Sequence, residues 1–168
     1  VDTVAIFAAA RRDATEKQGV PFAASVVFKN LMATGGILSL GLKLATRLQG
    51  LFFKDASAGL GLLSRFSLPL VGGGRLVPPL APTQFLDLPE VKAEGRAKEN
   101  GGPKVAFYSG CGINYLMPDV GLKSLAAIRK AGAEVFVPQG QVCCGMPAYA
   151  MGDIPTARSM ALKNLELL

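Results

Sequence analysis

The chain has 168 residues, which is enough for one domain or for one domain plus an appendage, and half of the residues are hydrophobic, which allows a sizeable core. Its formal net charge is +6, but the basic residues are scattered, no basic run is interleaved with aromatic residues and tryptophan is absent, so we expect no nucleic-acid partner. Histidine is also absent, which excludes a mixed Cys/His zinc site and any nucleophilic site that needs a histidine base.

The first third of the chain (residues 1–54) predicts a helical region. Residues 3–18 form a helix that Asp2 or Thr3 can cap and Gly19 can end, and two more helices are predicted over 22–33 and 36–53. Charged residues interrupt every apolar stretch before it reaches the roughly 20 residues that a bilayer span needs. The third helix has an amphipathic pattern, which favours a helix that covers its own core over one that packs on a partner or lies on a membrane.

Residues 55–103 are rich in proline and glycine and predict a linker strap. The stretch RLVPPLAPTQF should be extended, because residues before proline avoid the α region. The triple glycine at 72–74 indicates flexibility, and a charged, loose segment should follow over 91–103. We place a domain boundary near residue 103.

The last part of the chain, 104–168, predicts a regular α/β unit. Strands are expected over 105–109 and 134–138, with a helix over 119–132 between them. A last helix should begin near Asp153 or Ile154, with Pro155 in its first turn. The order strand–helix–strand–helix with short loops predicts a parallel sheet with a right-handed crossover, and hence the α/β fold class.

All three cysteines follow these two strands. Cys111 comes after the first strand, and Cys143 and Cys144 come after the second. Because the carboxyl ends of parallel strands lie at one edge of a sheet, where such folds bind ligands, we expect the three thiols to meet in space. Neighbouring glycines would let the backbone come close to a bulky inorganic ligand; they are Gly110, Gly112 and Gly145.

The residue types narrow the choice of ligand. An odd number of cysteines argues against a disulfide scaffold. Ligation by cysteine alone favours an iron–sulfur cluster or a soft metal, although three thiolates are one short of the usual four, so further ligands must come from elsewhere. Two alternatives stay open: a redox-active thiol pair without metal, and cysteines that act only as small buried hydrophobes.

Beyond the cysteines, the run from VAFYSGCGINY through PQGQVCCGMPAYA to the last helix resembles the cysteine-rich CCG domain of the iron–sulfur oxidoreductases. VDTVAIFAAARRDATEKQG and RLVPPLAPTQF resemble segments that precede this domain in iron–sulfur subunits of the glycolate oxidase type. That family also has a ferredoxin module, a later Cys-x-x-Cys and a second CCG repeat, none of which occurs in this sequence. The chain therefore looks like a middle fragment, with residues 104–168 as a first CCG domain truncated before its Cys-x-x-Cys.

The resemblance implies that Cys111, Cys143 and Cys144 hold an iron–sulfur cluster of unknown type, with Gly110, Gly112 and Gly145 beside it and no catalytic residue in this chain. It implies an electron-transfer subunit of an oxidoreductase complex. An FAD-binding partner would oxidise a 2-hydroxy acid such as glycolate or lactate, and electrons would pass on towards a quinone or another acceptor. Residues expected to support the centre are Gln141, Met146, Pro147 and Tyr149.

The same resemblance implies a cytoplasmic protein, or one bound peripherally to the inner face of the cell membrane. Two other functions stay open at this point. In a heterodisulfide-reductase-like subunit the cluster itself would cleave a disulfide, and in a structural domain zinc or a metal-free site would dock a partner.

Overall fold

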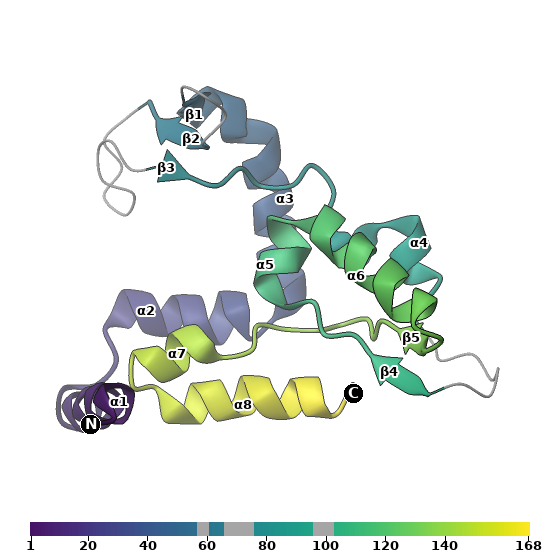
Figure 1. Ribbon diagram of the computed structural model, residues 1–168. Helices are drawn as coiled ribbons and strands as arrows, with labels where there is room; N and C mark the ends of the chain where they lie inside the picture. Colours follow the sequence, from purple (N-terminus) through teal and green to yellow (C-terminus); the bar gives the residue numbers. More distant parts are fainter. Residues whose placement is uncertain (57–60, 66–75, 96–102) are drawn as a thin grey trace.

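The computed structural model describes residues 1–56, 61–65, 76–95 and 103–168. Figure 1 shows helices of the N-terminal region beside an α/β part formed by the C-terminal residues, with a small antiparallel sheet at the far end of one long helix. The expected α/β class is confirmed. The triple glycine at 72–74 and residues 96–102 of the charged segment lie outside the described residues.

The N-terminal helices follow the sequence pattern closely. Helix α1 (Thr3–Gln18) is capped by the Asp2 carboxylate, which accepts a hydrogen bond from the Ala5 N–H, and it ends at Gly19, whose φ is 78°. The helix expected over 22–33 consists of α2 (Phe22–Val26) and a π-helical continuation, η1 (Val27–Met32). Helix α3 (Gly35–Phe52) follows.

The strap expected over 55–103 contains secondary structure that the sequence did not predict. Its first part forms an antiparallel sheet in which Leu62 pairs with Val77 and Leu63 with Leu76. Its last part forms two short helical turns. These elements are β1 (Phe53–Asp55), β2 (Leu62–Ser64), β3 (Leu76–Val77), η3 (Phe85–Asp87) and α4 (Pro89–Lys92). Three strands of two or three residues are too short to show an alternating pattern among glycines and prolines.

The C-terminal part has the expected parallel pair of strands, in which Val105 lies opposite Val135. Both strands are shorter than predicted, and two short helices were not predicted because each is only five or six residues long and begins next to a glycine. The elements are β4 (Lys104–Ala106), α5 (Gly110–Tyr115), α6 (Pro118–Lys130), β5 (Glu134–Phe136), α7 (Met146–Ala150) and α8 (Ile154–Leu165).

Two hydrophobic clusters join the segments. Phe85 and Val91, which precede the expected boundary at 103, are fully buried with α6 and β5 residues; the cluster is Phe85, Val91, Leu125, Val135 and Val137. The second cluster combines η1 and the residue after it with the cysteine loop and helices α7 and α8; it is Phe28, Ala33, Cys143, Ala148, Ala157 and Met160. Residues from both sides of position 103 therefore share a core, and the loop that carries Cys143 has N-terminal residues on one side.

Among the described residues, no single helix has both the length and the apolar character to cross a membrane. The segments Phe22–Asn30 and Gly35–Phe52 reach the length and apolar character of a membrane span only when they are taken together, and the pair is bent by 104°.

Candidate cysteine site

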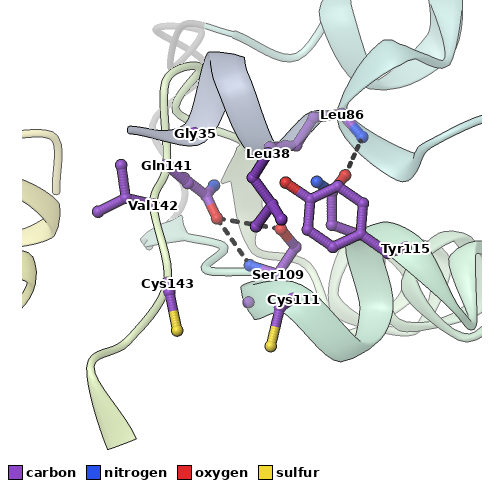
Figure 2. A pocket seen from close by; sticks show the side chains of 11 residues that line it. Gly35, Leu38, Leu86, Ser109, Cys111, Tyr115, Gln141, Val142 and Cys143 are labelled. Carbon is purple, nitrogen blue, oxygen red and sulfur yellow. Dashed lines mark hydrogen bonds between the residues drawn. The ribbon is translucent and has the colours of Figure 1, made fainter. Parts of the chain in front are cut away.

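Two loops at the carboxyl edge of the parallel sheet form the site. The chain leaves β4 and enters α5, whose second residue is Cys111, while β5 leads into the loop that carries Cys143 and Cys144. Figure 2 shows the Cys111 and Cys143 side chains next to each other, pointing to the same side of a small pocket. The expected convergence of the two loops is therefore present for these two cysteines.

The three thiols differ in their surroundings. Cys143 is only 4% exposed, whereas Cys111 and Cys144 are exposed, and none of the three is in a disulfide. Within the described ranges, no three His, Cys, Asp or Glu side chains are grouped so that they could hold a metal ion. The structure thus places Cys111 next to Cys143 but does not group Cys144 with them as a third metal ligand. The set of three cysteine ligands stays a prediction.

Hydrogen bonding makes the two paired thiols unequal. A hydrogen bond from Cys143 favours the thiolate of Cys111 and, with help from the backbone N–H groups of Cys111 and Gly112, lowers the pKa of Cys111 to about 6 despite partial burial. The same pairing, together with burial, raises the pKa of Cys143. The pairing therefore favours the thiolate form of Cys111 and the thiol form of Cys143.

Gln141 ties the two loops together. Its Oε1 accepts hydrogen bonds from the Ser109 N–H at 2.9 Å and the Ser109 hydroxyl at 3.1 Å (Figure 2). Its Nε2 donates to the Phe107 carbonyl at 3.0 Å and the Pro138 carbonyl at 2.9 Å. A side-chain amide has two donors and two acceptor sites, so all of the hydrogen-bonding capacity of this buried glutamine is used to join the ends of β4 and β5.

Two further side chains hold the Cys143 loop, and the sequence analysis did not identify them. Asn164 of α8 accepts a hydrogen bond from the Val142 N–H at 2.9 Å and donates to the Cys143 carbonyl at 3.2 Å. The Tyr108 hydroxyl donates to the Val142 carbonyl at 2.7 Å. Burial and the nearby cysteine thiols raise the pKa of Tyr108, so it stays protonated as a donor. The one signal for Asn164 in the sequence is an asparagine among the apolar positions of the last helix.

The flanking glycines have different roles. Gly145 has a φ of 87°, and a Cβ atom there would lie 2.8 Å from the Ala157 carbonyl oxygen, so the loop packs directly on the backbone of α8. Gly110 has a φ of 62° at the start of α5. Nothing lies within 4 Å of a Cβ built at Gly112, which leaves open space beside Cys111.

Of the other residues expected to support the centre, Met146 and Tyr149 are 62% and 46% exposed. Pro147 is half-buried in the first turn of α7. Only Gln141 of the four bridges the two loops.

The chemistry of the site fits a soft metal or a cluster. The candidate ligands are all sulfur, one paired thiol is already favoured as the thiolate that a metal binds, and space is open beside Cys111 and Cys144. The chain is thus of the class of α/β domains in which cysteines lie in loops at the carboxyl edge of a parallel sheet.

Comparison with known proteins finds a family match in the C-terminal part of the chain. Residues 105–168 match the family described as CCG, the cysteine-rich domain. No solved structure matches the chain.

Several curated proteins are similar over the same region. The chain is 40% identical over 70 residues to one subunit of the fumarate reductase (CoM/CoB) of Methanothermobacter marburgensis, which covers 42% of this chain and 14% of that protein. It is 32% identical to lactate utilization protein A of Bacillus subtilis (38% of this chain, 26% of that protein). It is 35% identical to one subunit of the anaerobic glycerol-3-phosphate dehydrogenase of Escherichia coli (38% of this chain, 16% of that protein). The match thus spans about a quarter or less of each of these relatives.

Proposed function

We propose that this chain is part of an iron–sulfur redox subunit of a multi-subunit oxidoreductase, in which Cys111, Cys143 and Cys144 are ligands of the cluster. The observation that carries the proposal is the pairing of Cys111 and Cys143 across two sheet-edge loops inside a CCG domain. Gly110, Gly112 and Gly145 would let the backbone approach the cluster, and the remaining ligands would come from outside these residues. Such a cluster supplies one-electron transfer between a donor and an acceptor.

We also propose which kind of complex contains this subunit. We infer a flavin-linked dehydrogenase of 2-hydroxy acids of the glycolate or lactate type, with an FAD-binding partner subunit and a membrane-associated, quinone-linked acceptor. Relatives named lactate utilization protein A support a 2-hydroxy acid, and the relative from the anaerobic glycerol-3-phosphate dehydrogenase supports a dehydrogenase complex. We also propose a domain boundary near residue 103. The location that we propose is the cytoplasm or the inner face of the cell membrane.

A second candidate is a catalytic centre that acts on a disulfide. The relative from the fumarate reductase (CoM/CoB), with 40% identity, supports this reading. A spectroscopic signal that changes when a small disulfide is added, without the flavoprotein, would favour it over a relay.

The test is iron and acid-labile sulfide content, with an electron paramagnetic resonance spectrum, on the anaerobically purified complete protein. We expect a cluster that is lost in Cys111→Ser and Cys143→Ser and retained in Ser159→Ala, an exposed α8 position. Absence of iron from the wild-type protein, or a cluster indifferent to both cysteine substitutions, would overturn the proposal and leave zinc or partner docking.

A further inference from the structure

Helix α3 carries a continuous apolar stripe on its outer side. The stripe residues are spaced three or four positions apart, which places them on one face of the helix. They are Ile37, Leu40, Leu44, Leu48 and Leu51, with exposed fractions of 56%, 71%, 58%, 41% and 64%. None of the side chains described in α3 is buried.

Three polar residues of α3, Ser39, Lys43 and Gln49, face the protein instead. The Ser39 hydroxyl donates to Gln84 at 2.6 Å, and Gln84 donates back to the Ser39 carbonyl at 2.9 Å. Gln49 accepts a hydrogen bond from the Leu80 N–H at 2.8 Å, and Lys43 pairs with Asp87 at 2.6 Å. A surface helix of a globular domain has the opposite orientation, with its apolar face on the core, so the stripe needs an apolar environment outside this fold.

The segment that carries the stripe has charged residues of one sign. From residue 19 to residue 54 the sequence contains no Asp or Glu, and its four cations are Lys29, Lys43, Arg47 and Lys54. Phe22 of α2, in the same cation-only segment, is 84% exposed. Lys43 is paired with Asp87, whereas Arg47 is exposed and lies three residues from Leu44 of the stripe. An apolar stripe in a segment with exposed cations and no carboxylate of its own is complementary to an anionic lipid surface, where leucines enter the acyl boundary and cations meet headgroups.

We propose that α3 lies in the plane of an anionic membrane surface, with the stripe from Ile37 to Leu51 inserted. This placement of α3 does not depend on the cluster, because membrane binding can be measured without a redox signal.

The experiment is flotation of the complete protein with phosphatidylglycerol-containing vesicles and with pure phosphatidylcholine vesicles. We expect binding to the anionic vesicles, weakened by salt, and at least about tenfold weaker in Leu44→Gln/Leu48→Gln because two inserted leucines are lost. Arg47→Gln should weaken binding roughly fivefold. Leu165→Gln is the matched control, since Leu165 is as exposed as Leu51 (65% against 64%) but lies on α8, and it should bind as the wild type does.

Three results would overturn the inference. They are failure of the wild-type protein to bind anionic vesicles, equal binding by the wild type and the double leucine variant, and a concentration-dependent self-association that the same substitutions abolish. Far-ultraviolet circular dichroism separates these outcomes from misfolding. Cluster content, measured in the same samples, separates failure of this inference from failure of the proposed redox function.

Discussion

At the scale of single residues, two glycines with nearly equal φ angles allow the cost of backbone strain to be compared with the cost of close packing. Gly140 and Gly145 have φ values of 84° and 87°, but only Gly145 faces the backbone of α8. We expect Gly140→Ala to cost about 1 kcal/mol of unfolding free energy, and Gly145→Ala to cost about 2–4 kcal/mol because overpacking adds to the strain. Urea denaturation of both variants measures the difference, and equal losses would contradict direct packing of the cysteine loop on α8.

Gln141 should set the distance between the two paired thiols. In metal-free protein of residues 1–168 with Cys144→Ser, Cys111 and Cys143 are the only thiols of that sequence, and a trivalent arsenical should bridge the pair. Gln141→Met keeps the side-chain length but removes the amide, so we expect bridging to be at least about tenfold slower.

The matched control is Gln139→Met, because the Gln139 amide donates to Val137, two residues before it, at 3.3 Å. Circular dichroism shows whether each variant is folded. If folded Gln141→Met protein binds the arsenical as fast as the control does, the positioning role is wrong.

At the scale of elements, Asp87 links three of them. It pairs with Lys43 of α3 at 2.6 Å and with Lys92 of α4 at 3.2 Å, and the hydrogen bond from Lys43 is the largest of the effects that lower its pKa. Because the folded-state pKa lies below the unfolded value of about 3.9, the pairing stabilises the fold above that pH. This contribution is lost as the pH falls through the lower folded-state pKa.

We therefore expect Asp87→Asn to lower the unfolding free energy by about 0.5–1 kcal/mol at neutral pH, since the lysines are half-exposed. The difference from wild type should shrink below about pH 4. Chemical denaturation across the pH range measures it. Asp13→Asn, which removes a carboxylate paired with Lys17 on the exposed face of α1, is the control with little expected effect. If the difference in unfolding free energy between wild type and Asp87→Asn grows as the pH falls, the pairing does not lower the pKa of Asp87 and the prediction is wrong.

The elements also show how far a sequence can predict this fold. The strands at 104–106 and 134–136 and helix α6 have clear periodic patterns and were predicted, and with them the edge where Cys111 and Cys143 meet. Helices α5 and α7 were not predicted, because a helix of five or six residues has too few turns for a pattern. Asn164 was missed because its role depends on contacts with a loop in another part of the chain.

At the scale of the whole molecule, the N-terminal helices complete the environment of the cysteine loop. Phe28 and Ala33 pack with Cys143, and the Cys143 N–H donates to the Met32 carbonyl at 3.3 Å. A long-range contact of this kind leaves no trace in local composition, and the sequence therefore predicted separate helical and CCG regions. The cysteine site is built from both.

Helix α1 contacts the rest of the protein through hydrogen bonds and not through buried side chains, and this difference is testable. It has no buried residue, and it contacts the end of α7 (Figure 1) through the Arg11 guanidinium, which donates to the Ala150 carbonyl at 2.8 Å, and the Thr15 hydroxyl, which donates to the Met151 carbonyl at 2.9 Å. A Cβ at Gly152 would lie 2.6 Å from the Arg11 carbonyl oxygen, so the approach is close. We expect α1 to open locally without unfolding of the body.

Thr15→Val removes one of the two hydrogen bonds and should increase the opening of α1 roughly fivefold, which hydrogen exchange measures on α1 amides. Exchange in α8 should not change, because the core around Met160 does not depend on α1. Arg12→Ala is the control, since Arg12 pairs with Glu16 in its own helix. If Thr15→Val accelerates exchange in α8 as much as in α1, the two helices unfold as one cooperative unit, and α1 stabilises the cysteine site directly.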